Sequence, residues 1–509
     1  MRVIGDLSRL NAIRYPHKIA LRMGGDSLTY EQLDERSNQL AHALTARGVA
    51  PGDRIALLAY NRLDYAIITQ GVAKCGAILT PMNFRLAPQE IATILRDCEP
   101  KVLFMEPGFA AAVAEAMRGA GPEIVFLPDP DPQPPGAPTL ASLCEGQPTS
   151  APSLLVAQES PCVIMYTSGT TGAPKGVLVS HETYFRMYLA TAVEASLRHD
   201  DVYLMAVPMF HAAGLNMMLH QALFMGASGV IHRGPFEPDL ILRMIQDHRV
   251  TFAVMVPTTV GMLAFHPGVE AYDVSSLDKI FYGSMPITPR ILDQARHVFP
   301  NVAFTQLYGS TESGMLGVLR WADHGRWSQT TGRQALLSEM RIVDDDGQAV
   351  PVGGVGEVIG AQRTMGMIGY WRNDRATAET IRNGWIYTGD LARVEPEGFF
   401  TLVDRRKDLI ISGGENIYPK EVENVLAAHP AVREVAVFGV AHELYGESVC
   451  AAVSLFPNQT ASIDELTAFC RGKIAGYKIP RRIDVLQALP RNASDKVQKA
   501  VLKAQFGKG

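Results

Sequence analysis

The segment from Tyr166 to Gly176 carries the residue types that bind a polyphosphate, and it reads Tyr-Thr-Ser-Gly-Thr-Thr-Gly-Ala-Pro-Lys-Gly. Gly169 and Gly172 let backbone N–H groups approach an anion closely, the hydroxyls add further donors, and Lys175 adds a positive charge. It is not a Walker loop, because Lys175 stands between a proline and a glycine and opens no helix. The alternative, a flexible linker, is disfavoured by the apolar runs that lead into and out of the segment.

Several polar stretches further along the chain need one explanation, although each alone is a weak signal. They are His211 in Pro-Met-Phe-His, Tyr308-Gly-Ser-Thr-Glu312, Tyr387-Thr-Gly-Asp390, Asp404-Arg405 with Ser412-Gly-Gly-Glu-Asn416, and Lys496. Two runs, Phe281 to Pro286 and Gln306 to Gly314, end in glycines and small polar residues. Ligands of open α/β sheets collect at such places, outside the carboxyl ends of strands.

The composition bounds the class of protein. At 509 residues the chain is too long for one compact core, which indicates two or more domains. The hydrophobic fraction of 47% and the charged fraction of 19% are typical of a soluble globular protein. The net charge of -5 argues against a nucleic-acid-binding surface, which needs clustered positive charge.

Cysteine usage and hydropathy indicate a cellular setting. The six cysteines are scattered without a Cys-x-x-Cys pair, which favours a reducing cytoplasm over a disulfide framework and gives no support to a zinc site. Arg2 is followed by a partly charged segment, so no secretory signal is expected. No apolar run reaches the ~18 residues of a membrane-spanning helix. We therefore expect a cytoplasmic protein without an integral membrane segment.

Short strands and helices alternate in the first part of the chain, which indicates an α/β layered domain. The patterns predict a hairpin over residues 18–30, a helix over 31–47, a strand over 54–58, a helix over 64–74, a strand over 77–80 and a surface connection over 129–153. Ser27 in Gly-Gly-Asp-Ser-Leu resembles the attachment site of a phosphopantetheine carrier domain. A hairpin turn is favoured there, because no carrier-type helix precedes it.

A second, smaller unit follows the charge cluster Asp404 to Asp408. Before it, the patterns predict strands over residues 199–208, 226–232 and 252–256 and a helix over 240–248. After it, they predict strands over 409–412, 434–440 and 449–455 and helices over 420–428 and 462–474. We expect an α/β fold with a large multi-layered N-terminal domain of mixed sheets (residues 1–405), a hinge at 406–408 and a small mobile α+β C-terminal domain (409–509).

Together and in this order, the polar stretches strongly resemble the adenylate-forming superfamily of acyl-CoA synthetases, peptide-synthetase adenylation domains and firefly-type luciferases. The resemblance runs from about Leu28 to Leu502 and is closest to the fatty-acid or aromatic acid–CoA ligases. It implies that a carboxylate attacks the α-phosphate of ATP to give an acyl-adenylate and pyrophosphate. A thiol then attacks the activated carbonyl. ATP, Mg²⁺ and coenzyme A (CoA) are the cofactors and co-substrates that it implies.

The resemblance also assigns roles to residues of the nucleotide site. The β- and γ-phosphates would lie against Thr167, Ser168, Gly169, Thr170, Thr171, Gly172 and Lys175. Glu312 would be the magnesium ligand with Thr311 beside the α-phosphate, and adenine would lie between Tyr308-Gly309 and the backbone of Gly283 and Ser284. Asp390 would bind both ribose hydroxyls, supported by Arg405.

Lys496 is implied to stabilise the α-phosphate, although Asp495 stands where glycine is usual; an ordinary surface lysine is the alternative. The small domain would rotate about Lys407 after adenylation and present Gly413 and Gly414 to the pantetheine arm. The candidate catalytic residues are Lys496, Glu312, Thr167 and His211. The segment 477–481 is a candidate for CoA phosphate contacts, with an exposed basic loop as the alternative.

The region from Val202 to Ala227 lacks Lys, Arg, Asp and Glu and clusters five methionines around His211, at positions 205, 209, 217, 218 and 225. The resemblance places this region along the acyl pocket, where methionines make adaptable apolar walls. A medium- or long-chain fatty acid is therefore expected, or an aromatic or branched acid; core packing of the methionines is the alternative. His211 would guard the path of the carboxylate and thiol.

Three other functions are considered, and two of them also begin by forming an acyl-adenylate. An adenylation module that loads a separate carrier protein is the nearest rival, but no carrier domain follows Lys496, and the Ser412–Pro419 segment is closer to the CoA-ligase version. A luciferase-like oxygenase and a non-catalytic nucleotide-binding protein are the others. The expected partners are a small-molecule carboxylic acid, ATP and CoA, with no nucleic acid. A homodimer is the usual assembly of the family, and the sequence itself does not define the oligomeric state.

Overall fold

A computed structural model describes residues 3–117, 121–129, 131, 133–167, 174–285, 287–412, 415–492 and 496–506, and its fold is mixed α/β as expected. The chain forms two compact units. The large unit comprises residues 1–340 and 360–386, and the small unit comprises 341–359 and 387–509. The predicted hinge at 406–408 lies within the small unit and remains a prediction.

One sheet of the large unit has seven strands in the order β18-β8-β7-β4-β3-β5-β6. Their bounds are Gly369–Tyr370, Lys175–Ser180, Pro161–Thr167, Ile78–Pro81, Arg54–Leu58, Val102–Met105 and Glu123–Phe126. The strands from β7 to β6 are parallel, whereas β8 is antiparallel to both of its neighbours. The apolar runs that lead into and out of the glycine-rich segment are therefore the two strands of the antiparallel pair β7–β8.

Helices cover both faces of this sheet, because alternate strand residues are apolar on both sides. On β3, Ile55 and Leu57 pack with helices α2 (Tyr30–Ala46) and α3 (Leu63–Lys74). Ala56 and Leu58 pack on the opposite face with helices α4 (Pro88–Cys98) and α5 (Ala110–Ala116). Helix α2 begins at a capping box in which Thr29 and Gln32 bond each other's backbone N–H groups.

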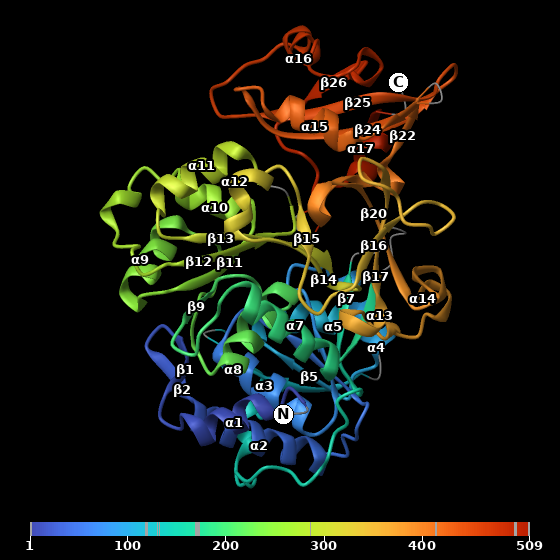
Figure 1. The fold of residues 1–509 in the computed structure, drawn as a ribbon. Helices are drawn as coiled ribbons and strands as arrows, with labels where there is room; N and C mark the ends of the chain where they lie inside the picture. Colours follow the sequence, from blue (N-terminus) through green and yellow to red (C-terminus); the bar gives the residue numbers. More distant parts are fainter. Residues whose placement is uncertain are drawn as a thin grey trace. The chain divides into compact units, whose positions relative to one another are not determined.

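The second sheet of the large unit runs in the order β15-β14-β13-β12-β11-β9-β10-β1-β2. The bounds are Gly332–Gln334, Gly314–Leu319, Ala303–Ser310, Lys279–Gly283, Phe252–Met255, Val202–Met205, Ser228–Ile231, Ile19–Met23 and Asp26–Thr29. Strands β13 to β1 are parallel. Helices α9 (Pro238–His248), α10 (Pro257–Ala264) and α11 (Pro289–Val298) cover one face, as Figure 1 shows.

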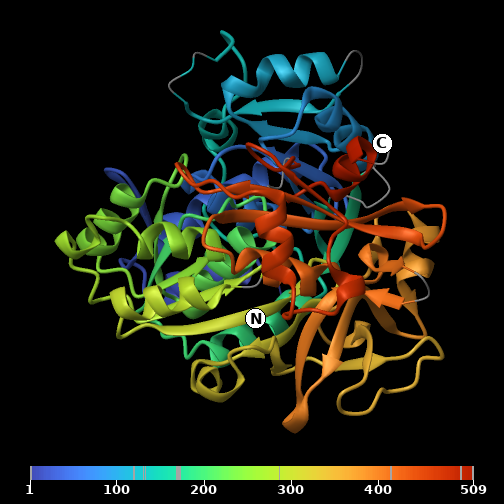
Figure 2. The same cartoon turned by 90° about the horizontal axis from the view of Figure 1, so that it is seen from above.

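The small unit contains two groups of paired strands. Strands β16 (Met340–Val343), β17 (Val355–Ala361), β20 (Trp385–Val394) and β21 (Phe399–Arg405) follow one another in the first. The second has the order β23-β22-β25-β24, with bounds Glu415–Ile417, Ile410–Ser412, Gly446–Leu455 and Val432–His442, and β26 (Arg482–Val485) pairs with β25. Its helices are α15 (Pro419–Ala427), α16 (Ile463–Cys470) and α17 (Lys499–Phe506), which are labelled in Figure 1; this part of the chain is orange to red in Figure 2. Residues of α15 and α16 share one core, and α17 contributes to another.

Most predicted elements are present with shifted ends. The region 199–208 contains the shorter strand β9, and the predicted surface connection 129–153 contains a short helix, α6 (Leu140–Cys144). Helix α16 ends at Cys470 rather than Ile474, and Gly472 follows in the left-handed region with φ 74°. Ser27 lies in β2, which confirms the hairpin interpretation.

Glu423 ties the C-terminal segment to the core of the small unit. Its carboxylate lies 2.8 Å from Lys499 Nζ and 3.4 Å from Lys420 Nζ, and it accepts a hydrogen bond from Val437 N at 3.0 Å. Burial alone would raise the pKa of Glu423, but the two lysines and the N–H hold it below its usual value of 4.5. Glu423 therefore anchors α17 just after Lys496.

We expect Glu423→Gln to destabilise the small unit at neutral pH by about 2 kcal/mol, because a charge-assisted contact is lost. A depressed folded-state pKa contributes stability above the unfolded value, near 4.5, and this contribution disappears as the pH falls through the lower folded value. The difference between the variant and the wild type should therefore vanish in acid. Hydrogen exchange of β24 and β25 measures this difference in stability, and Glu443→Gln is the control because Glu443 is exposed. A difference that is independent of pH would contradict the assignment.

Candidate active site

The hairpin β7–β8 presents the polyphosphate-binding candidates at its open end. Thr167 and Lys175 are cross-strand partners, the last residue of β7 and the first of β8. The predicted ligands Ser168, Gly169, Thr170, Thr171 and Gly172 lie outside the described residues. The structure thus positions both ends of the predicted loop, and the assignment of its interior remains a prediction.

A second hairpin, β13–β14, carries Tyr308, Gly309, Thr311 and Glu312. Its turn is closed by reciprocal bonds, because Ser310 N donates to Ser313 Oγ and Ser313 N donates to Ser310 Oγ. Tyr308 is buried on β13, and Thr311 and Glu312 are partly exposed in the turn. Gly283 is the register partner of Leu307 on the adjacent parallel strand. Gly283, Ser284 and Tyr308 therefore lie at neighbouring carboxyl strand ends, as expected for a ligand-binding edge.

Two of these glycines have a packing requirement of their own. A Cβ on Gly309 would lie 2.0 Å from Gly314 O, and one on Gly283 would lie 2.8 Å from Leu307 O. Real Cβ atoms do not approach backbone so closely, so the strands could not pair with larger residues. These positions are glycine because of strand packing, whatever ligand lies beside them.

Tyr370 joins the two hairpins, and sequence reasoning did not identify it. Its O–H donates to Glu312 Oε1 at 3.1 Å, and Lys175 Nζ lies 5.1 Å from the centre of its ring. Burial and then the Glu312 charge raise the pKa of Tyr370, so the phenol keeps its proton at neutral pH. The short run Gly-Tyr-Trp gives no local signal for this role.

The loop that carries His211 is positioned by Asn61, a second residue that the sequence did not reveal. The side-chain amide of Asn61 donates to Val207 O at 3.0 Å and accepts from Met209 N at 2.7 Å. A Cβ on Gly214 would lie 2.1 Å from Pro208 O, so only glycine fits the turn after His211. The imidazole of His211 lies against Phe210, with ring centres 4.6 Å apart.

The methionines of this region are mainly core residues. Met205, Met209 and Met218 are 0%, 1% and 0% exposed, and they belong to the main core of the large unit. Met217 and Met225 are partly buried at its margin. The alternative interpretation of the methionine cluster as core packing therefore applies to three of the five residues.

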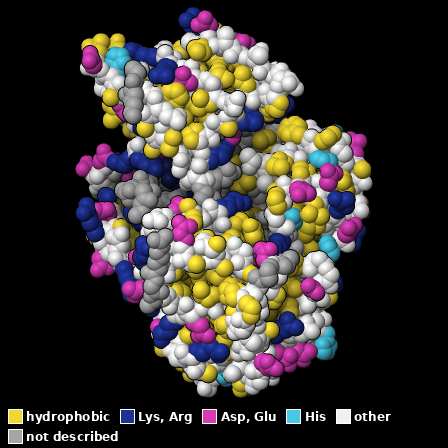
Figure 3. All heavy atoms as spheres, turned by 180° about the vertical axis from the view of Figure 1, so that it is seen from behind, with side chains coloured by type: hydrophobic (Ala, Val, Ile, Leu, Met, Phe, Trp, Pro, Cys, Tyr) yellow, Lys and Arg dark blue, Asp and Glu magenta, His cyan; other side chains and the backbone are white. Residues whose placement is uncertain are grey.

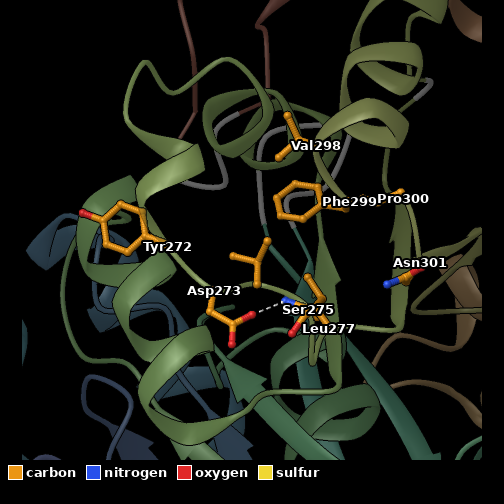
Figure 4. A pocket seen from close by; sticks show the side chains of 9 residues that line it. Tyr272, Asp273, Ser275, Leu277, Val298, Phe299, Pro300 and Asn301 are labelled. Atoms are coloured by element: carbon orange, nitrogen blue, oxygen red, sulfur yellow. Dashed lines mark hydrogen bonds between the residues drawn. The ribbon is translucent and has the colours of Figure 1, made fainter.

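A surface pocket lies away from these residues. It has a volume of about 240 Å³ and is lined by residues between Tyr272 and Leu277 and between Val298 and Asn301. Figure 4 shows Asp273 accepting the Ser275 N–H beside it, at 3.0 Å. These segments precede β12 and β13, so the pocket lies at the amino ends of the strands whose carboxyl ends carry Gly283 and Tyr308. The pocket is separate from the candidate site.

The small unit brings Asp390 and Arg405 together. They are cross-strand partners on β20 and β21, and Arg405 Nε lies 3.0 Å from Asp390 Oδ1. Glu357, which is 8% exposed, accepts from Gly389 N at 2.9 Å and lies 3.2 Å from Arg406 Nε. Glu357 thereby holds the backbone before Asp390, and the sequence alone did not single it out.

Residues at the predicted hinge have structural contacts of their own. Asp404 caps α15, because its carboxylate accepts from Lys420 N at 2.8 Å, and burial raises the pKa of Asp404. Burial lowers the pKa of Lys407, and the Asp408 charge partly opposes this. Residues 406–408 form a single helical turn. Gly413 and Gly414 lie outside the described residues.

Lys496 is exposed and precedes α17 by three residues. Asn492 N donates to Lys496 O and Lys496 N donates to Asn492 Oδ1, both at 2.9 Å. Asp495 lies outside the described residues. Lys478, in the segment considered for CoA phosphates, contacts both carboxylate oxygens of Glu421 at 2.7–2.8 Å. That ion pair competes with phosphate binding, and the assignment of the segment to CoA phosphates remains a prediction.

The donor set suits Mg²⁺ bound together with a nucleotide. Within the described residues no group of three or more His, Cys, Asp and Glu side chains could hold a metal by itself. Mg²⁺ usually takes one or two carboxylates and substrate phosphates, and Glu312 beside the hairpin with Lys175 fits this pattern.

Figure 3 shows positive and negative side chains interspersed on one face, and the net charge of the chain is -5. None of the helices in the described ranges has the length and apolarity to span a bilayer.

Comparison with known proteins finds similar sequences and structures that cover almost the whole chain. Residues 9–371 match the family described as AMP-binding enzyme, and residues 421–496 match the AMP-binding enzyme C-terminal domain. Feruloyl-CoA synthase of an Amycolatopsis species is 36% identical over 494 residues, covering 97% of this chain and 96% of the relative. Fatty acid–[acyl-carrier-protein] ligase ScoC of Streptomyces coeruleorubidus is 36% identical over 515 residues, covering 99% and 97%. The solved structure of the anthranilate CoA ligase AuaEII with anthranoyl-AMP has a TM-score of 0.90 at 28% identity, covering 99% and 97%.

Proposed function

The chain belongs to the AMP-binding enzyme family, and on this premise we propose that it joins an apolar carboxylic acid to CoA. It is an ATP-dependent, AMP-forming acyl-CoA synthetase. The observation that carries the proposal is that Tyr370 contacts both Lys175 and Glu312, so that a cation and a carboxylate lie on the same side chain. A metal–polyphosphate site needs such a pair of charges, which supports the proposal.

In the proposed reaction, the acid carboxylate attacks the α-phosphorus of ATP, the bond to the β-phosphate breaks, and pyrophosphate leaves. The CoA thiolate then attacks the acyl carbonyl, and AMP leaves with the bonding electron pair. Lys175 and Thr167 would hold the leaving phosphates, and Lys496 would stabilise charge on the α-phosphate. Glu312 would hold Mg²⁺, which neutralises phosphate charge when bound. Asp390 would accept both ribose hydroxyls, with Arg405 orienting its carboxylate.

The acid is proposed to have an apolar body. Support comes from the absence of Lys, Arg, Asp and Glu between Val202 and Ala227 and from the rings of Phe210 and Phe84, since Phe210 contacts both Phe84 and the His211 imidazole. A medium- or long-chain fatty acid is the first candidate. An aromatic acid is the second, favoured by the names of the feruloyl and anthranilate relatives. Loading of a carrier protein is the remaining alternative, since one relative is named for that reaction.

An acid panel tests this function with ATP, Mg²⁺ and either CoA or a carrier protein, scored by AMP release. We expect AMP and a CoA thioester with a fatty or aromatic acid, and at least about ten-fold lower kcat/KM with malonate, because an apolar wall leaves a second carboxylate unpaired. Thioester formation only on a carrier protein would contradict the CoA assignment. AMP release without any thiol acceptor, coupled to oxygen, would support a luciferase-like enzyme instead.

A further inference from the structure

We propose that Tyr370 is a positioning residue that holds Glu312 and Lys175 in the arrangement that binds MgATP. The inference rests on the proposed function and adds a residue that takes no part in bond making. Tyr370 would act through its two neighbours, by keeping each one directed at the nucleotide rather than at the other.

One side chain contacts both charged groups with the chemistry that suits each. The Tyr370 O–H donates to Glu312 Oε1 at 3.1 Å, a charge-assisted hydrogen bond that fixes the direction of the carboxylate. The ring receives Lys175 Nζ at 5.1 Å from its centre, within the range of a cation–π contact. An ammonium and a carboxylate attract each other, and a separate contact of each with Tyr370 restrains where each one lies.

The backbone around Tyr370 makes the same connection. Strand β18 pairs with β8 in the register Gly369 to Leu178 and Tyr370 to Val177. Trp371 N donates to Gly176 O at 2.7 Å, directly after Lys175. Three residues before Tyr370, Met367 N donates to Glu312 O at 2.8 Å. The segment 367–371 therefore joins the β7–β8 hairpin to the β13–β14 turn through main-chain bonds as well as through the side chain.

The segment is anchored on its other side, so Tyr370 cannot easily turn away. Trp371 Nε1 donates to Asp97 O at 3.1 Å, and the indole ring lies 5.3 Å from the Arg54 guanidinium. Arg372 Nη2 lies 2.6 Å from Glu99 Oε2. The backbone N–H of Tyr370 donates to Thr377 Oγ1 at 2.8 Å. These contacts restrain the strand without using the ring or hydroxyl of Tyr370.

The test is Tyr370→Phe in the full-length protein, because this change removes the hydroxyl, which bonds Glu312 and the Thr380 side chain, and keeps the ring. Calorimetric titration with ATP at several Mg²⁺ concentrations is expected to show about ten-fold weaker MgATP binding, the size of one lost charge-assisted hydrogen bond. Thioester formation from a preformed acyl-adenylate should stay within about two-fold of wild type, since that step needs no pyrophosphate site. A purely structural role would instead impair both half-reactions and lower the melting temperature.

Tyr272→Phe is the matched control, because Tyr272 O–H also donates to a carboxylate, Asp239 Oδ1 at 2.7 Å, beside the separate pocket. It should leave MgATP binding unchanged. In a Glu312→Gln background, Tyr370→Phe should weaken MgATP binding by less than about two-fold, because the two residues act as a unit. Unchanged MgATP affinity in Tyr370→Phe, or equal losses in both phenylalanine variants, would overturn the proposal. The calorimetric readout needs no acid substrate, so it is independent of the acid panel.

Discussion

Lys496→Ala is expected to reduce acid-dependent pyrophosphate release by at least about 100-fold, because one positive charge is lost where negative charge develops on the α-phosphate. Thioester formation from a preformed acyl-adenylate should remain within about two-fold of wild type. The two steps separate because Lys496 is proposed to act only while the phosphorus is attacked. Lys496 is exposed, so removing its side chain leaves the core of the small unit intact.

Separate rate assays of the two half-reactions test this prediction. Lys503→Ala on α17 is the control for the loss of a nearby positive charge. Lys503→Ala should leave both half-reactions unchanged. Equal loss of both steps in Lys496→Ala would contradict the proposed rotation of the small domain about residues 406–408. A loss confined to the thioester step would assign Lys496 to CoA binding instead.

Asp390→Ala is expected to lower kcat/KM for ATP by about 100-fold while leaving the KM for the acid within about two-fold. The side chain supplies two acceptor oxygens for the ribose hydroxyls, and its loss also leaves the Arg405 guanidinium without the carboxylate 3.0 Å away. Asp390→Asn should give an intermediate loss, because the amide keeps one acceptor oxygen.

The control is Glu395→Ala, since Glu395 follows β20 and lies 3.8 Å from the Arg393 guanidinium. Initial-rate kinetics with ATP and with 2′-deoxy-ATP measure the effect. Wild type should discriminate between the two nucleotides, and Asp390→Ala should not. Retained discrimination in Asp390→Ala would remove Asp390 from the ribose site, and a loss of the same size in Glu395→Ala would mark a general disturbance of the strand.

The local pattern of the chain determined much of the fold. Strands such as β3 and β11 and helices such as α2 follow from apolar periodicity and from end signals within a few residues of each other. The residue types of the proposed nucleotide site could be identified for the same reason, because glycine, hydroxyl and charged residues at strand ends interrupt an apolar run. The hairpin around Lys175 and the cross-strand pair of Asp390 and Arg405 match that pattern.

The sequence did not reveal the roles of residues whose partners lie far away along the chain. Tyr370 and Glu312 are 58 positions apart, and Asn61 is 148 positions from Met209, whose backbone it holds. Neither pairing leaves a period or spacing in the sequence, because it depends on which strands become neighbours. The role of Glu357 beside Gly389 is hidden in the same way.

The sequence by itself determined the family, the order of the elements and the residue types that could bind a nucleotide. Only the tertiary structure decided that Met205, Met209 and Met218 are core, that Asp404 caps a helix, and that Gly283 and Gly309 serve strand packing. The physical reason is that a side chain's identity sets what it can do, whereas burial and partners are set by contacts between segments far apart in the chain. Tyr370 is the clearest case, an ordinary strand tyrosine in sequence that joins two charged hairpins in space.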